Sequence, residues 1–445
     1  MKIYNSYTNR LEPFVPRHEG IISMYVCGPT VYNYIHIGNA RPVVIFDVVR
    51  RYFEAKGNIV RFASNFTDVD DKIIQKAKDE HTSELEVANH FINAFLTDLA
   101  SLNCKVDYIK PRVTEYMDEI IDYIKWLLDN GFAYAIEGDV YFRVSKITEY
   151  GRLSNRKLDD LISGARVEVN LKKESPLDFT LWKATSEGLN WKSPFSTGRP
   201  GWHTECVAMI DKIFGEEIDI HGGGSDLLFP HHENEIAQSI AHHDHIVATY
   251  WMHNGRLNLE GEKMSKSLGN VIFVKDLPKE RTGFRMFLLG THYRSPLNFN
   301  PESLTVYESE WAKLVKTIQT LYRSLELAGQ LHQNMPITEE SIRETLTTFD
   351  EALEADFNTP NALTALATLT KLMNQFQRQK NAYAVQNQAY SAMMYMLDIL
   401  GLDPKIKPLS NQDIALIRAW EAARGAKDFA KADALRAELA DKGLL

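Results

Sequence analysis

The first third of the chain alternates short apolar runs with longer amphipathic stretches. The run at 21–27, IISMYVC, is rich in β-branched and aromatic residues and leads into a Gly-Pro-Thr turn, so it predicts a strand. A helix is expected from about Gly38, and a second strand at 59–66 precedes another helix that Thr67 or Asp68 can cap. This alternation predicts an α/β fold with a Rossmann-like parallel sheet.

The pattern changes farther along the chain. From about 131 to 200 the periodicity weakens and Gly, Pro and Trp become frequent, with one short strand expected at 139–144, so this part is expected to be an insertion. The sheet is expected to resume near 216–220. After three glycines at 222–224, a helix is expected to begin at Pro230.

Beyond about residue 305 the strand signals vanish. Three or four amphipathic helices follow, and a Pro- and Ser-containing link at 402–412 leads to a last helical segment over about 413–441. The chain is therefore expected to be α/β with an all-α C-terminal bundle. Its expected parts are the first half of the Rossmann-like domain (1–120), an inserted subdomain (121–200), the second half (201–304), a helical bundle (305–401) and a linker with a short C-terminal region (402–445).

Composition and charge restrict the class of protein. The 445 residues are 44% hydrophobic and 24% charged, which is typical of a globular chain and excludes collagen-like and disordered classes. No long apolar run and no signal peptide is seen, so a cytoplasmic location is expected. The net charge of -9 excludes binding of nucleic acid by bulk positive charge, so a polyanion would have to meet a restricted surface such as 281–294.

Three cysteines are too few and too widely spaced for a disulfide framework. Cys27 and Cys206, together with His231 and Glu235, are of the types that bind zinc, and the last two are spaced i, i+4 so that they can share one helix face. From the residues alone, a metal site and a pair of core thiols remain equally open. Cys104 is expected to be a core thiol.

A first candidate motif is PTVYNYIHIGNAR at 29–41. His36 and Asn39 lie on either side of Gly38 at the expected start of a helix, where unpaired backbone N–H groups and a partial positive charge favour phosphate. Two donors on one turn could hold triphosphate oxygens as charge develops on the α-phosphate. By itself this histidine could equally be a cap or a core residue.

A second candidate motif is EKMSKSLGN at 262–270. Lys263 and Lys266 are three residues apart, interleaved with hydroxyls and flanked by glycines. They could bind a pyrophosphate leaving group. A solvated lysine loop is the alternative for two lysines with this spacing.

In this order the two motifs resemble the HIGH and KMSKS signatures of class I aminoacyl-tRNA synthetases, with Asn39 in place of the last histidine. The surrounding strings resemble the cysteinyl-tRNA synthetase family almost from end to end. These strings are MYVCGPTVYNYIHIGNAR, SNFTDVDDKI, GRPGWHTEC, FPHHENEIAQS, WMHNG and KMSKSLGN.

The resemblance implies a ligase that activates L-cysteine with ATP and magnesium to cysteinyl-adenylate and transfers it to tRNA(Cys). It also implies one zinc ion per chain, held by Cys27, Cys206, His231 and Glu235. Pocket shape alone would separate cysteine from serine by only about 10- to 200-fold, whereas zinc prefers a thiolate to a hydroxyl. No editing domain is expected.

The resemblance also implies roles for single residues. Thr67 and Trp202 would line the amino-acid pocket, and the neighbouring histidines would be exposed helix positions, namely His232, His242, His243 and His245. Phosphate and leaving group would be stabilised by His36, Asn39, Lys263 and Lys266. ATP would be contacted by Gly38, Gly222, Gly223, Gly224, Asp226 and Lys266.

For the domains, the resemblance implies that 201–304 carries the KMSKS loop and a stem-contact region. It also implies that 305–401 binds tRNA and that 402–445, which is short, binds the anticodon. A monomer without membrane contact is expected. Two alternatives remain: a ligase joining cysteine to an amino sugar, which would lack the helical C-terminal part, and a catalytically silent relative that binds tRNA or metal.

Overall fold

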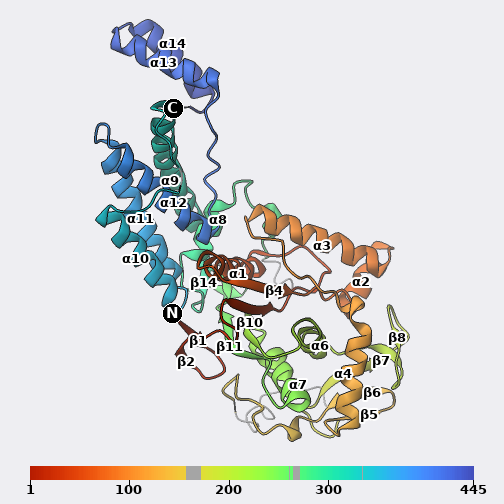
Figure 1. The fold of residues 1–445 in the computed structure, drawn as a ribbon. Coiled ribbons are helices and arrows are strands. Elements are labelled where there is room, and N and C mark those ends of the chain that lie inside the picture. The colour runs from red at the N-terminus through yellow and green to blue at the C-terminus, as the bar shows by residue number, and fades with distance from the viewer. Residues whose placement is uncertain (157–171, 260, 264–270, 333, 445) are drawn as a thin grey trace. The chain divides into compact units, whose positions relative to one another are not determined.

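The structure, a computed structural model, describes residues 1–156, 172–259, 261–263, 271–332 and 334–444 (Figure 1). The chain divides into two compact units. The first comprises 1–308, 350–363 and 399–402, and the second comprises 309–349, 364–398 and 403–445. Within the described residues, no helix has the length and apolar character needed to cross a membrane.

The centre of the first unit is a four-stranded parallel sheet in the order β11-β10-β3-β4. Its strands are β3 (Ile21–Val26), β4 (Ile59–Ser64), β10 (Ile218–Gly224) and β11 (Ala248–Asn254). Helix α1 (Ile37–Ala55) packs on this sheet and is buried along most of its length. The expected α/β fold with a Rossmann-like parallel sheet is confirmed. Three of its strands, β3, β4 and β10, overlap the predicted runs, and β11 was not predicted.

The expected cap of the second helix was wrong. Helix α2 (Asp71–Glu80) is capped by Asp70, whose carboxylate accepts the N–H of Lys72. Asp68 instead accepts two hydrogen bonds from Thr114 at 3.0 and 2.6 Å. Thr67, which donates to Glu205, and Asp68 therefore serve tertiary contacts, and the helix begins later than the first available capping side chain. Helix α3 (Glu84–Ser101) follows.

The inserted segment forms a separate five-stranded antiparallel sheet in the order β5-β6-β7-β9-β8, preceded by α4 (Met117–Asp129). The expected strand at 139–144 is confirmed as β6 (Asp139–Phe142). The other strands are β5 (Ala133–Ile136), β7 (Phe179–Ala184), β8 (Trp191–Lys192) and β9 (Thr197–Pro200). Helix α6 (Trp202–Phe214) then leads back to the central sheet.

The glycine run differs from expectation, because Gly222–Gly224 complete strand β10. Leu228–His232 form a short π-helix whose only non-helical residue is Phe229, so that helical backbone runs from Pro230, the expected helix start, into α7 (Glu233–His243). A Cβ at Gly222 would lie 2.2 Å from the Phe46 ring and 2.6 Å from the Met252 carbonyl oxygen. Glycine is therefore required there because α1 and β11 approach the strand closely.

Shorter elements complete the first unit. They are β1 (Lys2–Asn5), β2 (Arg10–Pro13), β12 (Leu257–Leu259), β13 (Glu262–Lys263), α8 (Thr282–Leu289) and β14 (Leu297–Phe299). Strand β12 pairs with β13 and β14.

The C-terminal part of the chain is helical, as expected. Its helices are α9 (Pro301–Leu327), α10 (Glu340–Glu354), α11 (Thr359–Gln377), α12 (Tyr383–Leu400), α13 (Asn411–Gly425) and α14 (Phe429–Asp441). The core of the second unit includes the buried side chains of Leu321, Leu325, Leu369, Met373, Met393 and Met396. The last expected segment is divided into two helices, and Asp428 caps the second.

Candidate functional site

The start of α1 is built by a reciprocal cap. The Nδ1 atom of His36 accepts the backbone N–H of Asn39 at 3.2 Å, and the side-chain oxygen of Asn39 accepts the backbone N–H of His36 at 3.2 Å. Since Nδ1 is the acceptor, a neutral His36 carries its ring proton on Nε2, and Asn39 retains its amide nitrogen as a donor. Both side chains of the signature can therefore donate to an anion at this helix end.

A pocket of about 270 Å³ opens at the carboxyl ends of the parallel strands. Six of the residues predicted from the sequence line it: Cys27, His36, Gly38, Asn39, Gly224 and Asp226. Gly222 and Gly223 are not in the lining, whereas Gly224, the last residue of β10, is. Asn254 and Arg256 also line this pocket. Sequence reasoning assigned them no role, although the first belongs to the quoted WMHNG string.

A second group of side chains gathers beside this pocket, at the end of β3. The Sγ atom of Cys27 lies 3.5 Å from the Sγ of Cys206, 3.5 Å from Nε2 of His231 and 3.4 Å from Oε1 of Glu235. His231 Nε2 and Glu235 Oε1 are 2.8 Å apart. Thus the four residues predicted as zinc ligands, which come from three distant stretches of sequence, converge with one ligand atom each.

The dimensions of this cluster fit a tetrahedral zinc ion. Zn–S bonds of about 2.3 Å and Zn–N or Zn–O bonds of about 2.0 to 2.2 Å require ligand atoms about 3.3 to 3.8 Å apart. The separations involving Cys27 fall in this range, and the closer His231–Glu235 pair would open slightly around an ion. Cys206, His231 and Glu235 are each at most 1% exposed. The donor set and its geometry therefore fit zinc.

The titration of these groups reflects their mutual proximity. Burial raises the pKa of Cys27 well above its usual value, and its contact with Cys206 adds to this. The hydrogen bond from Cys27 lowers the pKa of Cys206 to about 6. Burial disfavours the charged form of His231, but Glu235 and Cys206 outweigh it and raise the pKa of the imidazole to about 10. The protein thus stabilises a thiolate and a carboxylate next to a cation.

Two further histidines orient the ligands. His221 places Nδ1 3.0 Å from the Tyr25 carbonyl oxygen and Nε2 2.6 Å from Oε2 of Glu235. His203 places its Nδ1 3.0 Å from Nδ1 of His231. Second partners of this kind fix the direction in which a ligand presents its lone pair. Sequence reasoning gave neither histidine a role, although His203 lies within the quoted string GRPGWHTEC and His221 directly precedes the glycines at 222–224.

The expectation for the neighbouring histidines was wrong. His232 is fully buried, with its Nδ1 2.7 Å from Nε2 of His253, and the other three are half-buried: His242, His243 and His245. His232 and His221 also lie within ligand distance of Cys27 and Glu235. This region packs closely against β10 and β11, so helix positions next to the cluster face protein and not solvent.

The two residues predicted for the amino-acid pocket have different surroundings. The ring of Trp202 is 44% exposed and stacks on His231, with centroids 4.4 Å apart and planes inclined by 27°. Thr67 is buried, and its hydroxyl donates to Oε2 of Glu205 at 3.0 Å. Asn65 connects this threonine to the cluster, because it accepts the N–H of Gly28 and donates to Thr67.

Only part of the lysine motif can be placed. The backbone of Lys263 lies in β13, opposite Asn258 of β12, whereas Lys266 lies outside the described residues. The chain that follows the motif returns to α1, where the N–H of Ile37 donates to the carbonyl oxygen of Ile272 at 2.9 Å. The first signature is therefore hydrogen-bonded to the segment that follows the second.

Comparison with known families gives two matches. Residues 13–309 match the catalytic domain of "tRNA synthetases class I (C)", and residues 348–403 match the "DALR domain". Among solved structures, a Mycobacterium tuberculosis methionyl-tRNA synthetase in complex with methionyl-adenylate covers 90% of the chain with a TM-score of 0.59 at 15% identity, over 94% of its own length. An Agrobacterium radiobacter LeuRS–tRNA–LeuAMS complex covers 90% with a TM-score of 0.63 at 11% identity, over 88% of its own. Both show the fold alone.

Closer relatives are found by sequence. The chain is 46% identical to the cysteine–tRNA ligase of Staphylococcus carnosus over 100% of its length and 97% of the relative. It is 45% identical to that of Bacillus licheniformis and 46% identical to one from Bacillus cereus, over 100% of its length and 96% of each. Together with the class I catalytic domain, these identities show that the chain belongs to the cysteine–tRNA ligase family of class I tRNA synthetases.

Proposed function

We propose that Cys27, Cys206, His231 and Glu235 hold one zinc ion and that this site selects cysteine during its ATP-dependent activation. The chain is an aminoacyl-tRNA synthetase, a ligase that joins cysteine to tRNA at the cost of ATP. The convergence of two sulfur, one nitrogen and one oxygen ligand in a buried cluster carries the proposal. When bound, zinc would supply a Lewis acid that accepts the substrate thiolate in preference to the hydroxyl of serine.

The residues of the chain would hold the amino acid against this site. Trp202, stacked on His231 and partly exposed, is placed to cover the side chain of a bound cysteine. Thr67 is fixed by Asn65 and Glu205, and its hydroxyl proton is directed to Glu205. Its remaining lone pair is then suited to accept a hydrogen bond from a donor such as the α-ammonium group.

The pocket at the strand ends would bind ATP. His36 and Asn39 would donate to the triphosphate at the start of α1, where Gly38 permits close approach, and Asp226 would accept from a ribose hydroxyl. Lys263 and Lys266, with magnesium, would stabilise the departing pyrophosphate. The nucleophile is the carboxylate of cysteine itself, so the protein contributes position and electrostatic stabilisation.

Transfer to the 3' end of tRNA(Cys) would use the remainder of the chain. We assign acceptor-stem contacts to the region after the KMSKS string within 201–304, tRNA binding to the helices of 305–401, and anticodon contacts to 402–445. The match of residues 348–403 to the DALR domain supports the assignment of tRNA binding to 305–401. The inserted part at 121–200 would be a connective subdomain. A monomer acting in the cytoplasm is proposed.

A single experiment tests the zinc site and the reaction together. Zinc content is measured by elemental analysis, and exchange of labelled pyrophosphate into ATP is measured with cysteine and with serine. The wild-type chain is expected to hold one zinc and to exchange with cysteine. Cys206→Ser should lose zinc and much of its preference for cysteine. An active, zinc-free wild-type protein would contradict the proposal.

A further inference from the structure

The chain segment that follows the KMSKS string is hydrogen-bonded to the start of the signature helix. The N–H of Ile37 donates to the Ile272 carbonyl oxygen at 2.9 Å, and the N–H of Val274 donates to the Ile35 carbonyl oxygen at 3.0 Å. Between these two bonds, His36 and Phe273 face each other as an antiparallel bridge. The cap residue of α1 is thus one member of a short two-stranded ladder.

This ladder uses a donor that would otherwise be unpaired. The first N–H groups of a helix have no partner within the helix, and here Ile272 satisfies that of Ile37 while His36 satisfies that of Asn39. A shift of the 272–274 segment would therefore alter the donors at the same helix end that lines the pocket. The position of this segment is linked to the position of the phosphate-binding groups.

A side-chain cluster built around Tyr34 fixes the segment. The Nζ atom of Lys275 lies 3.7 Å from the centroid of the Tyr34 ring, close enough for a strong cation–π contact. The Tyr34 hydroxyl lies 3.3 Å from Nε2 of His90, and its ring meets Phe91 edge-on at 5.3 Å. Since His90 and Phe91 belong to α3, the tyrosine connects the 272–275 segment to a rigid helix.

The other side of the segment is fixed separately. Val274 is completely buried, and Arg281 donates to the Lys275 carbonyl oxygen at 3.3 Å while it pairs with Asp98 of α3 at 3.3 Å. Loss of the Tyr34 ring would therefore remove one support without releasing the segment entirely. Substitution of Tyr34 is therefore expected to shift the segment locally and not to unfold it.

From this arrangement we infer that Tyr34 is a positioning residue for adenylate formation: it holds Lys275, and with it the backbone of 272–274, against the cap of α1. It acts through His36 and through the chain that continues from the lysine string, and it needs no contact with substrate. The inference rests on the proposed function, because it assumes that the start of α1 and the string together hold the triphosphate. It predicts an effect on the rate of activation and not on the cysteine site.

The test is steady-state pyrophosphate exchange with four variants of the full-length chain. Tyr34→Ala and Lys275→Met should each lower kcat by about tenfold, the size expected for loss of a well-placed cation–π contact, while KM for cysteine stays within about twofold. Tyr34→Phe keeps the ring face and should retain most of the rate. The double variant Tyr34→Ala with Lys275→Met should be no slower than the slower single variant. Each single substitution already removes the same Tyr34–Lys275 contact.

Controls separate this role from a structural one. Lys279→Met removes an exposed lysine of the same segment and should leave kcat unchanged. Zinc content and the midpoint of thermal unfolding should be the same for Tyr34→Ala and wild type, within error. If kcat is unchanged, or if KM for cysteine and the unfolding midpoint change together with it, the positioning role is refuted. If the wild-type chain itself shows no cysteine-dependent exchange, the proposed function fails instead.

Discussion

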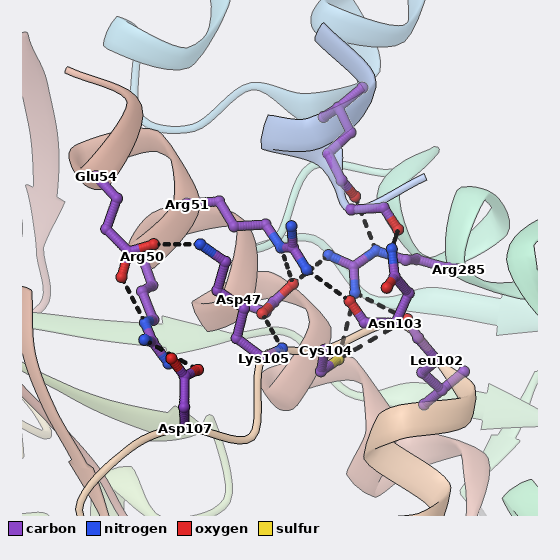
Figure 2. A network of polar contacts seen from close by, with 12 residues as sticks. Asp47, Arg50, Arg51, Glu54, Leu102, Asn103, Cys104, Lys105, Asp107 and Arg285 are labelled. Atoms are coloured by element: carbon purple, nitrogen blue, oxygen red, sulfur yellow. Dashed lines mark hydrogen bonds and ion pairs between the residues drawn. The ribbon is translucent and has the colours of Figure 1, made fainter. Parts of the chain in front are cut away.

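Two buried polar clusters in the first unit show opposite arrangements of charge. In the network around Arg285, the guanidinium donates from NH2 to Oδ2 of Asp47 at 2.5 Å, from Nε to the Leu400 carbonyl oxygen at 2.7 Å and from NH1 to the Leu102 carbonyl oxygen at 2.9 Å (Figure 2). Asp47 also accepts from Arg51 at 2.8 Å. Every charge in this network faces a group of opposite or complementary character.

The cluster around Cys27 instead gathers side chains that all present cation-binding atoms. Its four members present atoms that bind cations, and among them only His231 can itself carry a positive charge. The arginine network lowers the pKa of Asp47 although burial acts against this. In the cysteine cluster, burial and the neighbouring acidic groups raise the pKa of Cys27.

The difference separates a structural polar cluster from a functional one. Charges that already satisfy one another can be buried without a ligand. The cysteine cluster instead has two anionic ligand atoms, from Cys206 and Glu235, for the single positive charge of His231, and such an excess is costly until a further cation joins it. The arginine network should therefore determine how stable the first unit is, and the cysteine cluster should determine what it binds. Substitutions in each cluster test this division.

Arg285→Met is expected to have the largest effect. It leaves Asp47 buried with reduced compensation, and breaking a buried ion pair in this way costs about 3 to 5 kcal/mol. The free energy of unfolding from urea titration should fall by that amount, while zinc content of the folded protein is unchanged.

The double variant Asp47→Leu with Arg285→Met is the control, since it removes both charges. It should be less destabilised than the sum of the two single variants. If the loss of unfolding free energy in the double variant equals the sum of the two single losses, Asp47 and Arg285 contribute to stability separately and not as an ion pair.

Cys206→Ser is expected to have the next largest effect, and this effect is on zinc binding and not on stability. Replacing a sulfur ligand by a hydroxyl should weaken zinc binding by about 100-fold or more, because zinc prefers thiolate. Zinc affinity measured by competition with a chelator should show this loss. The unfolding free energy of the metal-free protein should be nearly unchanged.

Cys104→Ala is the matched control for that variant. Cys104 is equally buried, but its sulfur lies 3.3 Å from NH1 of Arg285 in the other cluster. Its replacement should leave zinc affinity and cysteine selection intact. Loss of zinc from Cys104→Ala would contradict the separation of the two clusters.

Sequence reasoning reached these two clusters to different degrees. The members of the cysteine cluster, which are the proposed zinc ligands, were predictable because Cys27 follows a strand, His231 and Glu235 are spaced four apart, and the surrounding motifs resemble a known family. The pair Asp47–Arg285 was not, since its members are far apart in sequence and arginine on a helix usually indicates an exposed position.

Local errors have similar tertiary causes. The sequence predicted a strand near 216–220 with the glycines after it, but strand β10 extends through Gly224. His232 was expected to be an exposed helix position, yet packing against His253 and Trp251 buries it. Such positions depend on what the rest of the chain places nearby, which local pattern does not contain.

His221→Gln is expected to have an intermediate effect and to define the edge of the metal cluster. The imidazole is not among the four proposed ligands, but it holds Oε2 of Glu235 at 2.6 Å. Loss of such an orienting partner typically lowers metal affinity by about 10- to 100-fold. The chelator competition should show this loss with one zinc still bound at saturation. An affinity equal to that of wild type would show that Glu235 needs no such partner.

Lys212→Met is expected to have the smallest effect, although it too breaks an ion pair in the first unit. Lys212 Nζ lies 3.2 Å from Oε1 of Glu119, and the two side chains are 59% and 31% exposed. Water solvates both charges when the contact breaks, so the change in unfolding free energy should be at most about 0.5 kcal/mol. Urea titration of this variant beside Arg285→Met compares two ion pairs in the same unit. If the two variants lose the same unfolding free energy, burial and complete pairing of the charges do not distinguish the arginine network from a surface ion pair. The contrast with the cysteine cluster would then lose its physical basis.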